Sequence, residues 1–398
     1  MTRIAKIRPV LLSAPYAHPE SLEVKLHLPA GHRTCGLVEV TLEDGTTGLG
    51  EGYLAVFAPR VFEKLVELVA PYLIGKDATQ IAARYADACS VVDYWSQQGA
   101  ARHVVSALEI ALVDAVAKQR GVPAWKLFAE SAPDSVALYG SGGDSITAPD
   151  MADEIALLSG KGIGIFKIRA RPGEARKAAW TLERAARAGI VVAVDMVQNL
   201  ANPGQRVEDV LRFLGDLRKQ TSLPLGFLEE SLGTGDLERY PALRAQAGGV
   251  PIAGGEIVTT GRELCARVRQ GWYDYAQPDA TVIGGVGETL SVFGAAREAG
   301  IETVVHCWGA AVGMMANYHA AFAGGARLAE WPMPAFAVRE ALMAAPLRIA
   351  GGRLARPDLP GLGVTLTPEL ERRFAFREDA VYRCLVPAPK LPADDVWQ

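Results

Sequence analysis

The chain has 398 residues, of which 49% are hydrophobic and 22% are charged. This composition is typical of a folded globular protein and excludes both a disordered chain and a single small module. The 41 basic and 45 acidic residues give a net charge of −4 at pH 7, which disfavours nucleic acid as a partner because the chain lacks a global positive field.

Cysteine usage and hydropathy indicate where the protein works. The five cysteines are widely spaced and form no CxxC pair, so they predict neither a disulfide framework nor a zinc knuckle, and we expect a cytoplasmic protein. Pro9 and Pro15 interrupt the N-terminal apolar run, which is too short for a signal peptide. Glu109 and Asp114 interrupt the best candidate for a membrane helix, so we expect no membrane partner.

An antiparallel sheet is predicted at the start of the chain. Strand-like runs occupy residues 3–13 and 35–53, and Asp44-Gly45 in the second run is a hairpin signal between alternating apolar positions. The segment between them, 14–34, holds three of the six histidines and several prolines and shows no period. We expect this segment to form a long lid loop, because loops of this length are often functional.

Helices and then a barrel follow. From about residue 58 to 128 apolar residues recur every three or four positions, which predicts a helical layer. After about residue 135, short apolar strands alternate with amphipathic helices. The strand candidates are 136–140, 163–169, 190–195, 225–230, 250–256, 273–279, 301–307 and 326–331. Eight such units without a dinucleotide-type GxGxxG turn predict a parallel barrel rather than an open sheet.

The predicted architecture is therefore α/β. We expect an N-terminal α+β capping domain over 1–130, including the lid loop, and a modified TIM-like barrel over 131–340 that carries the catalytic residues. The C-terminal segment 341–398 contains further β-like runs and is predicted to return to the capping domain.

Polar residues end consecutive barrel strands at intervals of about one βα unit. They are Asp195, Glu229, Glu256, Asp279, His306 and Glu330. The carboxyl ends of barrel strands meet at one mouth, where barrel enzymes keep their active sites. Any one of these acids is more simply explained as a solvated strand end or a helix N-cap, but three on consecutive units are not.

The first three acids predict a metal site. Carboxylates from neighbouring strands repel one another unless a divalent cation neutralises them. All-oxygen ligation favours Mg²⁺, with Mn²⁺ as the alternative, and three monodentate carboxylates leave coordination positions open. We therefore predict that Asp195, Glu229 and Glu256 bind one metal ion.

Motifs along the whole chain resemble those of the enolase superfamily, specifically its mandelate racemase/muconate lactonizing enzyme family. They are SALEIALVDAVAKQRGVPAWKLF (106–128), FKIR (166–169), VAVD (192–195), FLEE (227–230), AGGE (253–256), QPD with GGVGE (277–288), VVHCWG (304–309), LAEW (328–331) and PGLGV (360–364). The resemblance implies a (β/α)7β barrel beneath an α+β cap, one Mg²⁺ per subunit and a homo-oligomer, either an octamer or a dimer.

The resemblance also implies roles for single residues. Lys167 would neutralise the substrate carboxylate or the enolate, and His306 with Asp279 would form the general-base dyad on the opposite face of the substrate. Glu330 would bind a carboxylate oxygen of the substrate and, if kept neutral, donate a hydrogen bond as the enediolate forms.

Two positions depart from the family pattern. Arg169 stands where a second lysine base is usual, and a guanidinium stays protonated at physiological pH, which disfavours a two-base racemase or epimerase. The usual Asp-x-Asn is Asp195-Met196-Val197, so an amide contact is lost unless Gln198 or Asn199 supplies it.

The favoured function is a Mg²⁺-dependent lyase. It would abstract the proton α to a carboxylate, giving a metal-stabilised enediolate, and then eliminate water from an acid sugar, which needs only one base. The alternative is a sugar-acid lactone cycloisomerase or a racemase/epimerase of the same superfamily, and a non-enzymatic binding module ranks last. Tyr16, His18, His32 and Trp308 are predicted to contact the substrate, but the particular acid sugar is not determined by these residues.

Overall fold

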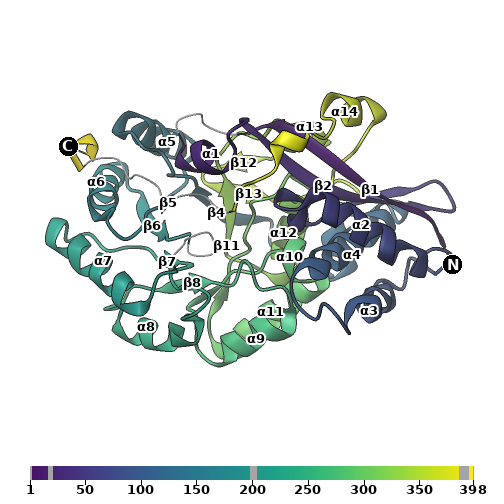
Figure 1. Ribbon diagram of the computed structural model, residues 1–398, viewed down its shortest axis with the longest axis horizontal. Helices are drawn as coiled ribbons and strands as arrows, with labels where there is room; N and C mark the ends of the chain where they lie inside the picture. Colours follow the sequence, from purple (N-terminus) through teal and green to yellow (C-terminus); the bar gives the residue numbers. More distant parts are fainter. Residues whose placement is uncertain (1, 17–20, 198–203, 385–393, 398) are drawn as a thin grey trace.

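A small α+β domain packs against a barrel in the computed structural model, which describes the chain except residues 1, 17–20, 198–203, 385–393 and 398 (Figure 1). The domain opens with strands β1 (Ile4–Pro15), β2 (His32–Leu42) and β3 (Thr47–Glu51), which form an antiparallel sheet. Gly45 adopts a φ of 85° in the turn between β2 and β3, a conformation that glycine reaches without strain. The predicted sheet and its hairpin are thus confirmed.

The helical layer covers one face of this sheet. Its elements are η1 (Tyr53–Val56), α2 (Pro59–Val69), η2 (Ala70–Tyr72), α3 (Ile81–Val92), α4 (Ala100–Gln119) and η3 (Ala124–Leu127). Helix α4 lies so close to β3 that a Cβ added at Gly50 would stand 1.7 Å from the Ala107 carbonyl oxygen. From Val104 to Ala117 every residue of α4 is buried, because it is packed between the cap and the barrel.

The segment 14–34 is more ordered than the expected loop. Strand β1 continues to Pro15, a short helix α1 covers Leu22–His27, and β2 begins at His32. Ser21 forms an isolated bridge with Ser145, which lies in the barrel loop after the first strand. The described part of the segment is therefore held by both the sheet and the barrel.

The barrel strands follow the predicted order. They are β4 (Ser135–Ser141), β5 (Ile165–Arg169), β6 (Val191–Asp195), β7 (Leu228–Glu229), β8 (Ile252–Gly254), β9 (Tyr275–Ala276), β10 (Glu302–Thr303) and β11 (Leu328–Pro332). Consecutive strands from β4 to β10 pair in parallel, and β11 pairs in parallel with β4. The eighth strand thus returns to the first, which confirms the TIM-like barrel.

Helices surround this barrel on the outside (Figure 1). They are α5 (Ala148–Lys161), α6 (Ala175–Ala186), α7 (Val207–Gln220), η5 (Leu237–Arg239), α8 (Tyr240–Gln246), α9 (Gly261–Arg269), α10 (Ala280–Ile283), α11 (Val286–Ala299) and α12 (Ala311–Gly324). A separate buried apolar cluster includes residues from several barrel strands: Tyr139, Ala193, Phe227, Ala253 and Val304. Because these side chains fill the interior, the barrel is a packed core rather than a pore.

The C-terminal segment contacts both domains. Its elements are α13 (Ala337–Leu342), β12 (Ile349–Ala350), β13 (Arg353–Ala355), α14 (Pro368–Arg373), η6 (Glu378–Ala380) and η7 (Asp394–Trp397). Strand β13 pairs antiparallel with β4, whereas Phe374 accepts a hydrogen bond from the Ser13 N–H of β1. Among the described residues, no helix is long and apolar enough to cross a bilayer.

Candidate active site

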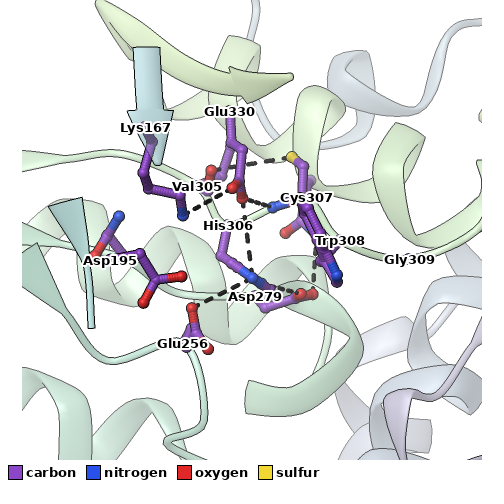
Figure 2. Close-up of polar contacts among 12 residues, drawn as sticks. Lys167, Asp195, Glu256, Asp279, Val305, His306, Cys307, Trp308, Gly309 and Glu330 are labelled. Atoms are coloured by element: carbon purple, nitrogen blue, oxygen red, sulfur yellow. Dashed lines mark hydrogen bonds and ion pairs between the residues drawn. The ribbon is translucent and has the colours of Figure 1, made fainter. Parts of the chain in front are cut away.

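Figure 2 shows that the side chains of Asp195, Glu256, Asp279, His306 and Glu330 face one space at the barrel mouth, and Glu229 joins them through its ion pair with Lys167. Asp195 and Glu229 are the last residues of β6 and β7 and are directly paired in the ladder between these strands. Lys167 comes from β5, and Glu330 comes from β11. The barrel topology therefore gathers residues that are up to 163 positions apart in the sequence.

Glu229 is fully buried between a cationic and an amide side chain. Its carboxylate pairs with the Lys167 ammonium, and its Oε2 accepts a hydrogen bond of 2.5 Å from Gln277 Nε2. Burial raises the pKa of Glu229 to about 8; the Lys167 charge opposes this rise, and the carboxylates of Asp195 and Glu256 add to it. The pKa of Glu256 is raised to about 7, again chiefly by burial.

The raised pKa values of Glu229 and Glu256 mean that their negative charges are poorly compensated in this site. The donor set, three buried or nearly buried carboxylates with raised proton affinity in two of them, suits a divalent cation that prefers oxygen ligands. Within the part of the chain that the structure describes, no group of three His, Cys, Asp or Glu side chains is already arranged to hold a metal ion. Glu229 instead contacts Lys167, and Glu256 faces His306.

Two backbone positions beside these acids are strained. Val197 and Glu230 have φ of 49° and 38°, in the left-handed region that side-chain-bearing residues rarely adopt. The Val197 N–H donates to Asp195 Oδ1 at 2.7 Å, and Glu230 Oε1 accepts from the Gly255 N–H at 2.6 Å. Such conformations cost about 1–3 kcal/mol each and are typical of functional sites.

His306 and Asp279 form the expected pair. Asp279 Oδ2 lies 2.8 Å from His306 Nδ1, while His306 Nε2 lies 3.3 Å from Glu256 Oε2. Burial by itself would lower the pKa of His306, but the carboxylates of Glu256, Glu330 and Asp279 raise it to about 10. The three carboxylates therefore favour the charged imidazolium, and neutralising Glu256 would lower the pKa of His306.

Glu330 is buried beside two positively charged groups. Burial by itself would raise its pKa, but the charges of Lys167 and His306 and the N–H of Cys307 lower it to about 2. Lys167 Nζ lies 2.9 Å from Glu330 Oε1, and the Cys307 N–H donates to Glu330 Oε2 at 2.5 Å. The neighbouring positive charges thus favour the ionised carboxylate, and the donor role of a neutral Glu330 stays a prediction.

Arg169 borders the same space. Its Nε lies 3.9 Å from Asp195 Oδ2, and its guanidinium carbon lies 4.7 Å from the ring centroid of Trp308. Trp308 is buried, and its Nε1 has no hydrogen-bond partner among the described residues. Arg169 thus presents a permanent cation beside the acids.

Tyr16 and His32, two of the predicted substrate contacts in the segment 14–34, contact other parts of the protein in the structure. Tyr16 is buried edge-on against Phe336, with ring centroids 5.4 Å apart, and His32 Nδ1 lies 2.9 Å from the Ala30 carbonyl oxygen. His18 lies outside the described residues, as do Gln198 and Asn199. The substrate role of these residues stays a prediction.

The capping domain supplies a neighbour of the site, Tyr53, that the sequence interpretation did not assign, and Arg33, which it considered for specificity, contacts Tyr53. The ring of Tyr53 lies edge-on to His306 with centroids 6.5 Å apart. Arg33 donates 3.1 Å hydrogen bonds to the Tyr53 hydroxyl and to the Trp308 carbonyl. No spacing rule points to these residues, because tertiary packing alone brings the cap to the barrel. Gln277, in contrast, lies within the QPD motif, so the sequence could have identified it as a site residue.

Two family models match the chain. Residues 24–129 match the mandelate racemase/muconate lactonizing enzyme N-terminal domain, and residues 150–370 match the enolase C-terminal domain-like model. These matches cover most of the chain, which therefore belongs to the mandelate racemase/muconate lactonizing enzyme family of the enolase superfamily. The resemblance found in the sequence motifs is confirmed.

Similar proteins include enzymes of two reaction types. D-galactarolactone cycloisomerase of Agrobacterium fabrum is 26% identical over 353 residues, which cover 85% of this chain and 90% of that protein. L-talarate/galactarate dehydratase of Salmonella typhimurium is 26% identical over 341 residues, which cover 84% and 81%. The crystal structure of an L-talarate/galactarate dehydratase mutant liganded with Mg and L-glucarate has a TM-score of 0.79 at 26% identity, covering 94% of this chain and 92% of that one. These relatives support an enolase-superfamily enzyme without fixing its reaction.

Proposed function

We propose that this protein abstracts the proton α to the carboxylate of an acid sugar and then eliminates a β-hydroxyl as water. One observation carries the proposal: neutralising the Glu256 carboxylate, which lies 3.3 Å from His306 Nε2, would lower the pKa of His306 and let it act as the base, whereas both cationic residues of β5 stay charged. The carboxylates of Glu229 and Glu330 outweigh burial and raise the pKa of Lys167 well above its usual value. Arg169 cannot act as a base near neutral pH.

Each step then has a residue to perform it. His306 Nε2 takes the α-proton, and the electron pair passes into the substrate carboxylate to give an enediolate. Lys167 stabilises the negative charge that develops there. The imidazolium returns its proton to the leaving hydroxyl, so that water departs, and the resulting enol tautomerises to a 2-keto acid.

A divalent cation fits the acidic side of the same space. Asp195, Glu229 and Glu256 are the residues that would hold Mg²⁺, with Mn²⁺ as an alternative. When bound, the ion would supply positive charge to the carboxylate oxygens of the substrate. The dehydratase structure that holds Mg and L-glucarate supports this assignment by similarity.

A lactone cycloisomerase is the second candidate. The relative from Agrobacterium fabrum favours it, since that enzyme is a D-galactarolactone cycloisomerase. Such a reaction also runs with one acid/base group, so the His306 arrangement serves it equally. We also propose the predicted domain boundaries, a lid role for the segment 14–34 and a cytoplasmic location. The proposed assembly is an octamer or a dimer.

Proton exchange in D₂O tests the proposal. Purified enzyme with Mg²⁺ is incubated with a library of monoacid sugars, diacid sugars and their lactones, and NMR follows both the α-proton and the product. We expect exchange from one face, with a 2-keto acid as product, and loss of both in His306→Asn. Rearranged lactone without a keto acid would favour the cycloisomerase.

Arg169→Lys tests the single-base argument. It places a titratable amine on the opposite face, so exchange from that face should appear. Arg171→Lys is the matched control, because Arg171 lies two residues on and faces Asp144 and Glu174. Exchange that persists in His306→Asn would refute the assignment of His306 as the base.

A further inference from the structure

The carboxylate of Glu51 lies at the boundary between the two domains. Glu51 is the last residue of β3 in the capping domain and is 2% exposed. Its Oε1 accepts a hydrogen bond from the Ala310 N–H, and its Oε2 accepts one from the Gly313 N–H, both at 2.7 Å. These two donors belong to the start of helix α12, where backbone N–H groups lack partners within the helix.

Helix α12 depends on this outside carboxylate. Its N-cap residue is Ala310, whose side chain cannot accept a hydrogen bond. The acceptor is instead Glu51 of the capping domain. The helix sequence also leaves room for the carboxylate. A Cβ at Gly309 would stand 2.9 Å from Glu51 Oε1, and a Cβ at Gly313 would stand 3.1 Å from Oε2 and 2.6 Å from Thr281 Cγ2.

The same helix holds the His306 dyad. Asn317, one turn beyond Gly313, donates from Nδ2 to Asp279 Oδ1 at 2.9 Å and accepts the Ala280 N–H at 2.8 Å. Asp279 Oδ2 in turn lies 2.8 Å from His306 Nδ1. His306 itself lies only four residues before the N-cap of the helix.

We propose that Glu51 is a positioning residue: by holding the N-terminus of α12, the capping domain sets the orientation of Asp279 and His306. The proposal rests on the proposed function, since it takes His306 as the base. A displacement of about 1 Å in a catalytic group can cost about 10²-fold in rate. Loss of the Glu51 contacts should therefore lower kcat far more than it changes KM.

A second carboxylate provides a matched control. Glu109 of α4 is also buried, and it accepts hydrogen bonds from Val286 N–H at 2.9 Å and Gly287 N–H at 3.0 Å at the start of α11. The N-cap of α11 is a glycine, as devoid of a capping side chain as Ala310. Within the described parts of the chain, no hydrogen bond joins α11 to the dyad. Glu109 thus makes the same type of interdomain contact without reaching the base.

The test compares Glu51→Gln with Glu109→Gln in the full-length enzyme. In both variants an amide NH₂ faces one backbone donor, so the two should lose similar stability in a thermal melt. We expect kcat to fall about 10–10²-fold in Glu51→Gln, with KM changed less than threefold, and to stay near wild type in Glu109→Gln. An equal fall in both variants, or wild-type kcat in Glu51→Gln, would overturn the proposal.

A readout that does not depend on turnover separates this proposal from the proposed function. In protein labelled with ¹⁵N-histidine, the His306 imidazole signals are assigned by their loss in His306→Asn. These signals should shift in Glu51→Gln and not in Glu109→Gln, whether or not any acid sugar reacts. If Glu51→Gln does not fold, Gly313→Ala perturbs the same contact from the helix side. Unchanged His306 signals in the folded variant would refute the positioning role.

Discussion

Replacing Asp279 with asparagine should disable His306 without unfolding the protein. Asp279 Oδ1 accepts hydrogen bonds from Asn317 Nδ2 at 2.9 Å and from both the N–H and the Oγ1 of Thr281 at 2.8 Å. Only Oδ2 faces His306 Nδ1, at 2.8 Å. These contacts fix which end of an asparagine amide would face the imidazole.

The amide oxygen of Asp279→Asn must take the Oδ1 position. Placing its NH₂ group there would set a donor against three donors, and each buried donor left without an acceptor costs about 1–3 kcal/mol. The NH₂ group then points at His306 Nδ1, which must become the acceptor. The imidazole proton moves to Nε2, and the nitrogen that faces the substrate loses the lone pair needed to take a proton.

The expected result is a fall in kcat of about 10²–10⁴-fold, the usual contribution of a general base. Initial rates of dehydration measure this fall, and ¹⁵N NMR of His306 reports the tautomer. Asp274→Asn is the control, because Asp274 precedes β9 at the opposite end of the barrel and pairs with Arg244. A less than tenfold fall, with the wild-type tautomer retained, would refute the reasoning.

Three further outcomes are expected. Glu229→Gln should abolish metal-dependent activity and weaken Mg²⁺ binding measured by calorimetry; unchanged affinity would contradict the ligand assignment. Gly50→Ala should destabilise the protein by about 1–3 kcal/mol or more in urea titrations, since its Cβ would stand 1.7 Å from the Ala107 carbonyl oxygen. His319, whose Nδ1 accepts the Trp125 N–H, has its pKa lowered by burial to about 3. As the pH falls below about 6.5, the His319 imidazole takes up a proton in the unfolded chain but stays neutral in the folded protein. The free energy of unfolding should therefore fall by up to about 1.4 kcal/mol per pH unit between about 6.5 and 3. His319→Gln should reduce this slope, and an unchanged slope would argue against a buried neutral imidazole.

Charge states within the site were harder to predict than positions. The family motif placed Glu330 correctly on the eighth strand, but it did not show which charges surround the carboxyl group. Lys167 and His306 lie beside it and lower its pKa to about 2. The charge of a buried group depends on distances to all its neighbours, and the chain order of these residues does not contain those distances.

The sequence by itself determined the barrel and the ring of polar strand ends. Short apolar strands bury both faces and leave their polar residues at the ends. The regular intervals between the polar residues from Asp195 to Glu330 therefore reflect the length of the repeated βα unit. The order of the described strands follows from this spacing. The departure at Arg169 was equally plain, because residue chemistry alone makes it a poor base.

Only the tertiary structure decided how the capping domain meets the barrel. The segment 14–34 shows no period in the sequence, but its described part is held by strands, a short helix and the bridge from Ser21 to Ser145. Glu51 and Tyr53 reach the His306 region through packing of β3 and η1 against the barrel. Contacts of this kind join residues more than 250 positions apart, where neither helical nor strand periodicity carries information.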